Sequence, residues 1–294
     1  MPKLVPHLWY DKEAKEAAMF YTSLFDRSKL LNVGLIQNTP SGDVEIVSFE
    51  LAGQQFEAIS AGPFFQFNPS CSLMVACDSV EEVNIKWQAL LEGGLALMPL
   101  DAYPFSKWYG WVQDRYGLSW QLMLVEEQLK SPQKITPNLL FSDRVCGKAE
   151  EAVTYYTKIF NDAEGAMISR YQEGEAINTK AKVNFASFRI EGMQLSAMDN
   201  GYDVDYSFNE AFSIMVKCRD QREIDYYWNA LSAVPEAEQC GWVKDKFGVS
   251  WQIVPEFMDE ILFYGSREEV QNVTEAFLKM KKFDIAALEK AKIG

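Results

Sequence analysis

An internal repeat is the feature of this sequence that most constrains its fold. The segment GWVQDRYGLSWQ at residues 110–121 recurs as GWVKDKFGVSWQ at residues 241–252. Further matches keep the same order in both halves of the chain: Pro6 with Pro137, Phe25 with Phe160, Cys77 with Cys218, and Trp87 with Trp228. An ordered series of this kind does not arise by chance, so the chain contains two copies of one unit.

The repeat sets the domain organisation. With 294 residues the chain has room for two domains of ordinary size. We place the first repeat at 1–125, a polar linker at 126–134, the second repeat at 135–258 and a tail at 259–294.

Each repeat reads as two βαβββ modules. In the first repeat, residues 3–10 have the character of a strand, and residues 11–25 carry apolar side chains at helical spacing. Strand patterns follow at 30–37, 43–51 and 54–60, with turn residues between them. A second strand and helix then open the next module.

Capping residues mark the helices of the second modules. Ser79 and Asp220 each stand three residues before a glutamate, the spacing of an N-terminal helix cap. The helices that follow carry Trp87 and Trp228 on their apolar faces, so we expect both tryptophans in the core rather than against a ligand. Ser266 opens a third such helix in the tail, whose apolar stripe is expected to cover a sheet edge or a partner: Val270, Val273, Phe277 and Met280.

Composition excludes several classes of function. The 42 acidic and 28 basic residues give a net charge of -14, which opposes binding to a phosphate backbone, so we expect no nucleic-acid partner. No apolar run reaches the length of a membrane helix, and no signal-type segment opens the chain. The five cysteines are odd in number and form no C-x-x-C pair. We therefore expect a cytoplasmic protein with reduced thiols and no membrane contact.

Several segments resemble a known family. They are VPHLWY at 5–10, EAAMFY at 16–21, GPFFQFN at 62–68 and CGWVKDKFGVSWQIVP at 240–255. Together they resemble the PhnB-like group of the vicinal-oxygen-chelate superfamily, which contains glyoxalases and bleomycin-resistance proteins. That group is often labelled 3-demethylubiquinone-9 3-methyltransferase. The tail segment at 279–291 is similar to the C-terminal end of members with one repeat, which pair as dimers. The chain therefore resembles a covalently fused dimer, expected as a monomeric pseudo-dimer or a homodimer.

The resemblance implies an α+β fold. In it, tandem βαβββ modules form two cupped eight-stranded mixed sheets, with a C-terminal helical tail and a ligand or metal site inside each cup. In metal-using relatives the ligands come from the first and last strand of each module. Counted onto this sequence, those positions are His7, Glu57, Ser72 and Gln121 in the first repeat, and Asn138, Ser196, Ser213 and Gln252 in the second.

Coordination chemistry decides what these positions can hold. A catalytic zinc ion usually needs about three imidazole, thiolate or carboxylate ligands plus water. The second repeat offers none, and the first offers His7 and Glu57 beside the neutral Gln121. We expect no metal and no cofactor. The alternative is a loosely bound divalent metal in the first repeat, with His7, Glu57 and Gln121 as weak candidate ligands.

The candidate site residues follow from the same positions. His7 is the single histidine, and on a strand it shares a face with Trp9. If that face lines the cup, His7 and Glu57 could form a hydrogen-bonded base and orienting carboxylate and are the candidate catalytic residues. The alternative is that His7 is a satisfied polar group at a degenerate site. The candidate ligand-binding residues are Trp9, Trp111, Gln121, Trp242 and Gln252. For Trp111 and Trp242, structural packing is the open alternative.

Three functional hypotheses remain open. The first is a protein that binds a small organic molecule in a cupped sheet without a metal. The second is an enzyme that uses His7, Glu57 and Gln121, either metal-dependent or by acid-base chemistry, on a small oxygenated substrate. The third is a structural or interaction module. Methyl transfer is disfavoured, because the chain contains no G-x-G-x-x-G string for a nucleotide-type methyl donor.

Overall fold

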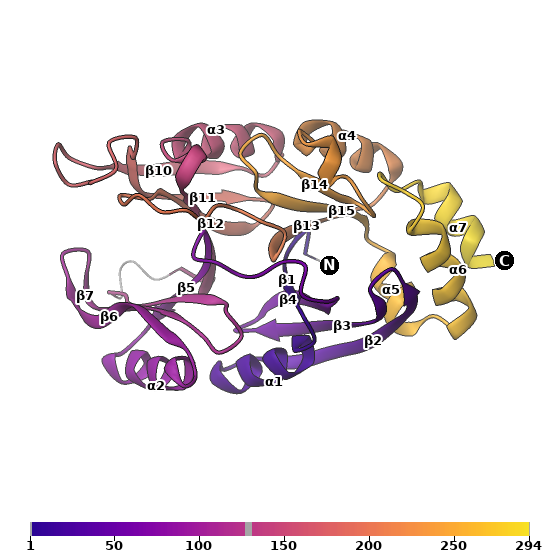
Figure 1. Cartoon of the computed structure of the whole chain (residues 1–294), viewed down its shortest axis with the longest axis horizontal. Coiled ribbons are helices and arrows are strands. Elements are labelled where there is room, and N and C mark those ends of the chain that lie inside the picture. Colours follow the sequence, from indigo (N-terminus) through magenta and orange to yellow (C-terminus); the bar gives the residue numbers. More distant parts are fainter. Residues whose placement is uncertain (1, 127–130, 294) are drawn as a thin grey trace. The chain divides into compact units, whose positions relative to one another are not determined.

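The computed structural model describes residues 2–126 and 131–293 (Figure 1). The chain forms two compact units, and each unit draws on both sequence repeats. Unit 1 contains the chain up to Ser23, Arg27–Gln66 and everything from Asn209 on. Unit 2 contains Leu24–Asp26 and Phe67–Phe208. Each unit therefore joins the first module of one repeat to the second module of the other.

Unit 1 is built on a seven-stranded mixed sheet of order β14-β15-β13-β1-β4-β3-β2. Its strands are β1 (Leu4–Tyr10), β2 (Lys29–Thr39), β3 (Gly42–Leu51), β4 (Gln54–Ser60), β13 (Phe212–Cys218), β14 (Trp242–Lys244) and β15 (Ser250–Pro255). Its helices are α1 (Ala14–Leu24), which ends at the unit boundary, α4 (Gln221–Leu231), α5 (Met258–Tyr264), α6 (Arg267–Phe277) and α7 (Ile285–Ile293).

Unit 2 is built on an eight-stranded mixed sheet of order β10-β11-β12-β9-β5-β8-β7-β6. Its strands are β5 (Cys71–Cys77), β6 (Leu95–Tyr103), β7 (Ser106–Gln113), β8 (Ser119–Leu124), β9 (Ile135–Phe141), β10 (Glu164–Arg170), β11 (Val183–Ile190) and β12 (Met193–Asp199). Its helices are α2 (Val80–Leu91) and α3 (Ala149–Ile159). The predicted architecture of βαβββ modules in two mixed sheets with a helical tail is confirmed.

The expected count of eight strands is wrong for unit 1. Twenty-four positions separate Trp87 from Trp111 in the first repeat, whereas fourteen separate Trp228 from Trp242 in the second. The shorter connection holds a single 3-10 turn, Pro235–Ala237, where unit 2 has strand β6. Ten fewer residues and a proline leave no room for another strand, so the sheet ends at β14.

The two sheets share one register at their centres. In unit 1, His7 on β1 lies opposite Glu57 on the parallel strand β4 and opposite Ser213 on the antiparallel strand β13. In unit 2, Asn138 on β9 lies opposite Ser196 on β12 and Ser72 on β5 in the same way. The two centres can therefore be compared residue by residue.

Local sequence signals explain the helix starts. Ser79 accepts a hydrogen bond from the Glu82 amide at 3.1 Å, and Asp220 accepts one from the Glu223 amide at 2.9 Å. Ser266 and Glu269 form a complete capping box at the start of α6.

The predicted cores form as well. The apolar faces of α2 and α4 bury Trp87 and Trp228, as predicted. A Cβ on Gly110 would lie 2.5 Å from the Trp87 ring, so only glycine fits beside this tryptophan. All five cysteines are free thiols, and burial raises the pKa of Cys77 to about 12.

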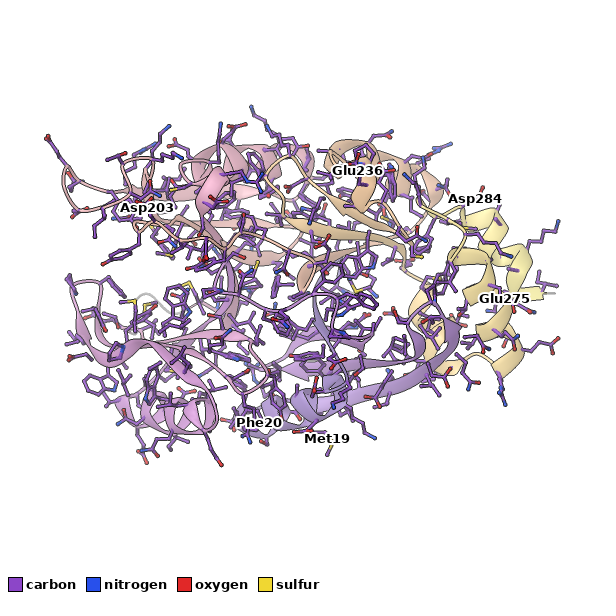
Figure 2. All side chains as sticks on the ribbon, in the orientation of Figure 1. Met19, Phe20, Asp203, Glu236, Glu275 and Asp284 are labelled. Carbon is purple, nitrogen blue, oxygen red and sulfur yellow. The ribbon has the colours of Figure 1, made fainter. Side chains whose placement is uncertain are left out.

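Many acidic residues are exposed. Among them are four that Figure 2 labels: Asp203, Glu236, Glu275 and Asp284. Across the described ranges, none of the helices is both long and apolar enough to cross a membrane. Of the predicted linker at 126–134, residues 127–130 lie outside the described part of the chain.

Candidate ligand-binding site

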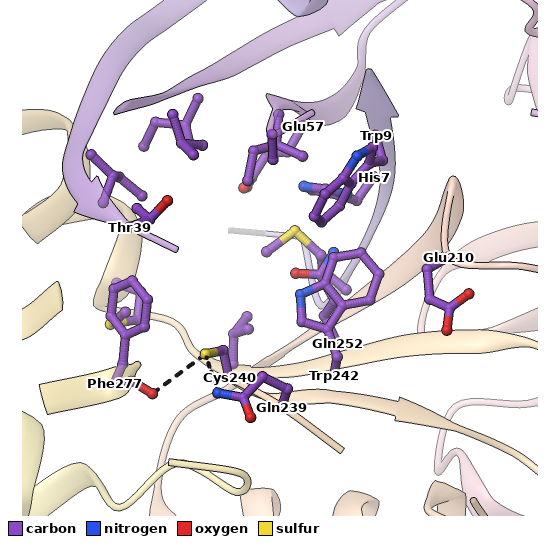
Figure 3. Close-up of a pocket in the computed structure, with 18 of the residues that line it drawn as sticks. His7, Trp9, Thr39, Glu57, Glu210, Gln239, Cys240, Trp242, Gln252 and Phe277 are labelled. Carbon is purple, nitrogen blue, oxygen red and sulfur yellow. Dashed lines mark hydrogen bonds between the residues drawn. The ribbon is translucent and has the colours of Figure 1, made fainter. Parts of the chain in front are cut away.

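Unit 1 contains a cavity of about 460 Å³ (Figure 3). Side chains on one face of its sheet form one wall: His7 and Trp9 from β1, Glu57 from β4, Met215 from β13 and Gln252 from β15. They share this face because alternate residues of a strand point to the same side.

The tail forms the opposite wall. Phe277 and Leu278 at the end of α6 line the cavity together with Phe283. The backbone amides of Cys240 and Gly241 donate hydrogen bonds to the carbonyls of Met280 and Lys281, at 2.9 and 2.8 Å. The tail is thereby fixed against the segment that leads into β14, as its apolar stripe required.

A glycine makes this contact possible. Gly241 has a positive φ of 84°, and a Cβ on it would lie 2.7 Å from the Phe283 ring. The preceding Cys240 lines the cavity, and its thiol accepts a hydrogen bond from the Gln239 amide and donates one to the Phe277 carbonyl (Figure 3).

Aromatic rings surround the centre of the cavity. The Trp242 ring lies 5.5 Å from His7 and 5.9 Å from Trp9, both in edge-to-face geometry. Phe65 meets Trp9 at 5.1 Å. The Trp9 indole N–H donates to the carbonyl of Gly62 at 2.8 Å, which fixes the ring. The lining therefore offers flat apolar faces held by their own contacts.

Lys217, Glu57 and Asp259 form a buried ion network beside the cavity. Lys217 on β13 is 3 % exposed, and its Nζ donates to Glu57 Oε1 at 2.7 Å and to Asp259 Oδ1 at 2.5 Å. Although burial opposes its charged form, these carboxylates raise the pKa of Lys217. Burial raises the pKa of Glu57, and the Lys217 charge opposes that shift. One cation is thus shared by two carboxyl groups.

His7 is a neutral imidazole at physiological pH. Burial, assisted by the Lys217 charge, lowers the pKa of His7 to about 3. Its Nδ1 is buried and has no hydrogen-bond partner among the described residues. Glu57 accepts its hydrogen bond from Lys217 instead. Among the described residues no hydrogen bond joins Glu57 to His7, so the expected pair of base and orienting carboxylate is not formed.

Gln252 also retains an open group. Its amide N–H donates to Ser213 Oγ at 2.9 Å, while its carbonyl oxygen accepts from no group that the structure describes. The polar centre of unit 1 therefore contains polar atoms that have no hydrogen-bond partner among the described residues.

At the equivalent centre of unit 2 the polar side chains hydrogen-bond to one another. Gln121 donates to Ser72 Oγ at 2.8 Å and accepts from the Tyr109 hydroxyl at 2.8 Å. Asn138 accepts from Ser196 at 2.9 Å and donates to Ser72 at 3.4 Å. Every member of this set is buried and bonded to another member.

The eight sequence-predicted positions occupy these two centres, in a different grouping from that expected. His7 and Glu57 meet Ser213 and Gln252 in unit 1. Ser72 and Gln121 meet Asn138 and Ser196 in unit 2. The expected set of His7, Glu57 and Gln121 is divided, because strands β1 and β9 pair with the second module of the other repeat.

The predicted tryptophans divide in the same way. Trp9 and Trp242 line the cavity of unit 1. Trp111 belongs to unit 2, where its indole N–H donates to Ser119 Oγ at 2.5 Å. The repeats alone did not indicate which halves pair.

Metal coordination does not fit the residues present. Across the described ranges, no group of three or more His, Cys, Asp or Glu side chains could hold a metal ion. In unit 1 the carboxylates of Glu57 and Asp259 already bind the Lys217 ammonium, which leaves His7 and the neutral amide of Gln252 as the remaining candidate ligands.

Sequence reasoning missed Lys217, Asp259 and the tail residues of the cavity. A lysine in a strand is typical of a solvent-facing position, and nothing local distinguishes Lys217. Phe277 carried a usable signal, because it belongs to an apolar stripe that had to be covered.

Comparisons with known proteins agree with this fold. Glyoxalase I from Zea mays is 12% identical, covers 90% of this chain and 98% of its own length, and superposes with a TM-score of 0.53. A proposed dioxygenase from Bacillus subtilis is 12% identical over 99% of this chain and 96% of its own, with a TM-score of 0.50. The fold is that of the glyoxalase class.

The family follows from the sequence. The profile described as 3-demethylubiquinone-9 3-methyltransferase matches twice, over residues 2–123 and 133–254, and the chain belongs to this PhnB-like family in two copies. A PhnB protein from Bacillus cereus is 40% identical over 41% of this chain and 98% of its own, with a TM-score of 0.39. A comparison with curated proteins gives no match.

Proposed function

We propose that the protein binds a small organic molecule in the cavity of unit 1 and holds it without a metal ion. The observation that carries this proposal is a cavity of about 460 Å³ that is lined by aromatic rings and by Gln252, whose carbonyl oxygen accepts no hydrogen bond from the described residues. A cavity of this volume lies within the usual range for small-ligand sites. The flat faces of Trp9 and Trp242 favour an aromatic or alicyclic ligand.

Acid-base catalysis has less support. A general base near neutral pH needs a pKa close to that pH, and His7 has a pKa of about 3. Glu57 is committed to Lys217. The methyltransferase in the family description is not part of the proposal, because the chain lacks a Gly-rich nucleotide turn.

Binding can be tested with a neutral apolar fluorophore, N-phenyl-1-naphthylamine. We expect one molecule to bind per chain with an increase in its fluorescence. Cys240→Tyr introduces at the aligned position the residue that unit 2 carries as Tyr109, and its larger side chain should occupy cavity volume and weaken binding at least about tenfold. Cys240→Ala is the matched control, because it leaves the cavity open, and its affinity should stay within about twofold of the parent.

Two results would contradict the proposal. One is the absence of probe binding to the parent protein up to the solubility of the probe. The other is unchanged binding by Cys240→Tyr in a variant whose thermal unfolding shows that it is folded, since the probe would then lie elsewhere.

A further inference from the structure

Most of the polar groups that the cavity leaves open are hydrogen-bond acceptors. Gln252 has used its amide N–H on Ser213 and keeps its carbonyl oxygen. The neutral imidazole of His7 has one acceptor nitrogen and one N–H donor. Glu57 and Asp259 each accept from Lys217 through one carboxylate oxygen, and the two carboxyl groups also lie within hydrogen-bonding reach of each other. A ligand that satisfies this set must donate hydrogen bonds.

The charged side chains that line the cavity are acidic. The single ammonium of Lys217 faces two carboxylates, so one negative charge is left when both are ionised. Among the described residues that line the cavity there is no lysine or arginine, while Glu210 and Glu236 add further carboxylates. Glu210 is paired with Lys244 at 2.9 Å, which leaves the excess on the inner groups and on the exposed Glu236.

The surrounding rings suit the same kind of ligand. Trp9, Trp242 and Phe65 stand at centroid distances of 5.1 to 5.9 Å in edge-to-face pairs, and all three line the cavity. Aromatic faces attract a cation, most strongly where water is displaced. His7, which is 6 % exposed with an unpartnered Nδ1, lies among them.

From these observations we propose that the ligand of unit 1 is an organic cation, an aromatic or alicyclic amine. Its ammonium group would donate to the carbonyl oxygen of Gln252 and to the carboxyl oxygens of Glu57 and Asp259, and its ring would lie against Trp9 and Trp242. This inference rests on the function proposed above and adds the charge and hydrogen-bonding class of the ligand.

Three probes with one ring and different polar ends test the inference: 1-naphthylmethylammonium, 1-naphthylmethanol and 1-naphthoate. Isothermal titration calorimetry of the whole protein at neutral pH should give a dissociation constant for the ammonium at least about tenfold below that for the alcohol. The carboxylate should bind more weakly than the alcohol, because it meets the excess negative charge.

Two substitutions test the origin of the preference. Glu57→Gln and Asp259→Asn each remove one carboxylate and leave Lys217 the other. Each should reduce the preference for the ammonium over the alcohol to about threefold or less. Glu289→Gln on α7 removes the same charge at an exposed position and should leave the preference unchanged.

The outcomes separate this inference from the proposed function. Equal binding of ammonium and alcohol, tighter binding of the carboxylate, or a preference that survives in both carboxylate variants would overturn the inference. Each of these results leaves the binding of N-phenyl-1-naphthylamine, and with it the proposed function, intact. Failure of that neutral probe as well would reject both.

Discussion

The two units hold the same four strand positions at their centres and use them differently. In unit 2 the positions carry Asn138, Ser196, Ser72 and Gln121, which hydrogen-bond to one another. In unit 1 they carry His7, Glu57, Ser213 and Gln252, of which only the last two bond within the set. A shared register therefore gives a closed polar core in one unit and an open site in the other.

Residues outside the four positions cause much of this difference. Tyr109 in unit 2 fills the space beside Gln121 and packs against Tyr103 and Phe105. Cys240 holds the matching sequence position in unit 1, where strand β6 has no counterpart. The small side chain of Cys240 and the absence of a strand like β6 leave room for the cavity of unit 1, and the tail forms one of its walls. Ala76 in unit 2 likewise matches Lys217 in unit 1.

The ion network should produce the largest difference in stability between the units. Lys217→Ala leaves Glu57 buried without its cation, and removal of one partner of a buried ion pair typically costs about 3 to 5 kcal/mol. The double variant with Glu57→Ser reproduces the Ala76 and Ser196 pair of unit 2. We expect it to regain part of the loss in urea unfolding. A double variant no more stable than Lys217→Ala would show that the carboxylate of Glu57 is not the source of the cost.

The pH dependence of stability should reveal the same asymmetry. Native His7 has a pKa of about 3, against an ordinary value of 6.5. Between these values the unfolded chain binds a proton that native His7 does not, so stability falls as pH falls, by about 1.4 kcal/mol per pH unit for this group. His7→Asn, the residue of unit 2, removes that contribution.

Urea unfolding at several pH values below 6.5 gives the comparison. The parent should lose stability more steeply than His7→Asn as pH is lowered. His7 is the single histidine, so its imidazole signals in an NMR titration provide a direct check. An imidazole that titrates near 6.5 in the folded protein, or equal slopes for the two proteins, would contradict the neutral buried state.

Much of the fold was accessible from the sequence. Local signals predicted the modules, because alternation, helical spacing and capping pairs such as Ser79 with Glu82 act over a few residues. The family resemblance, counted four residues on from the turn glycines Gly53 and Gly248, placed Glu57 and Gln252 at the centres.

The remainder depends on contacts between distant segments. The pairing of β1 with β13 joins residues about two hundred positions apart, and two similar repeats make the alternative pairing equally consistent with the local pattern. Lys217 is buried only because Glu57 and Asp259 meet it from two other elements. Neither fact is visible in a window of sequence, so the grouping of the site and its ion network were missed.

The smallest effect expected concerns the hydroxyl that closes unit 2. Tyr109→Phe removes the donor to Gln121 Oε1 and leaves a buried carbonyl oxygen without a partner, which costs about 1 to 2 kcal/mol. Tyr103→Phe is the matched control, because its hydroxyl bonds to the Pro99 carbonyl at an exposed site where water can replace it. Neither substitution should change the affinity for N-phenyl-1-naphthylamine, since both residues belong to unit 2. If Tyr109→Phe lost no more stability than Tyr103→Phe, the polar network of unit 2 would not be closed, and the contrast between the two centres would rest on the cavity and the ion network of unit 1 alone.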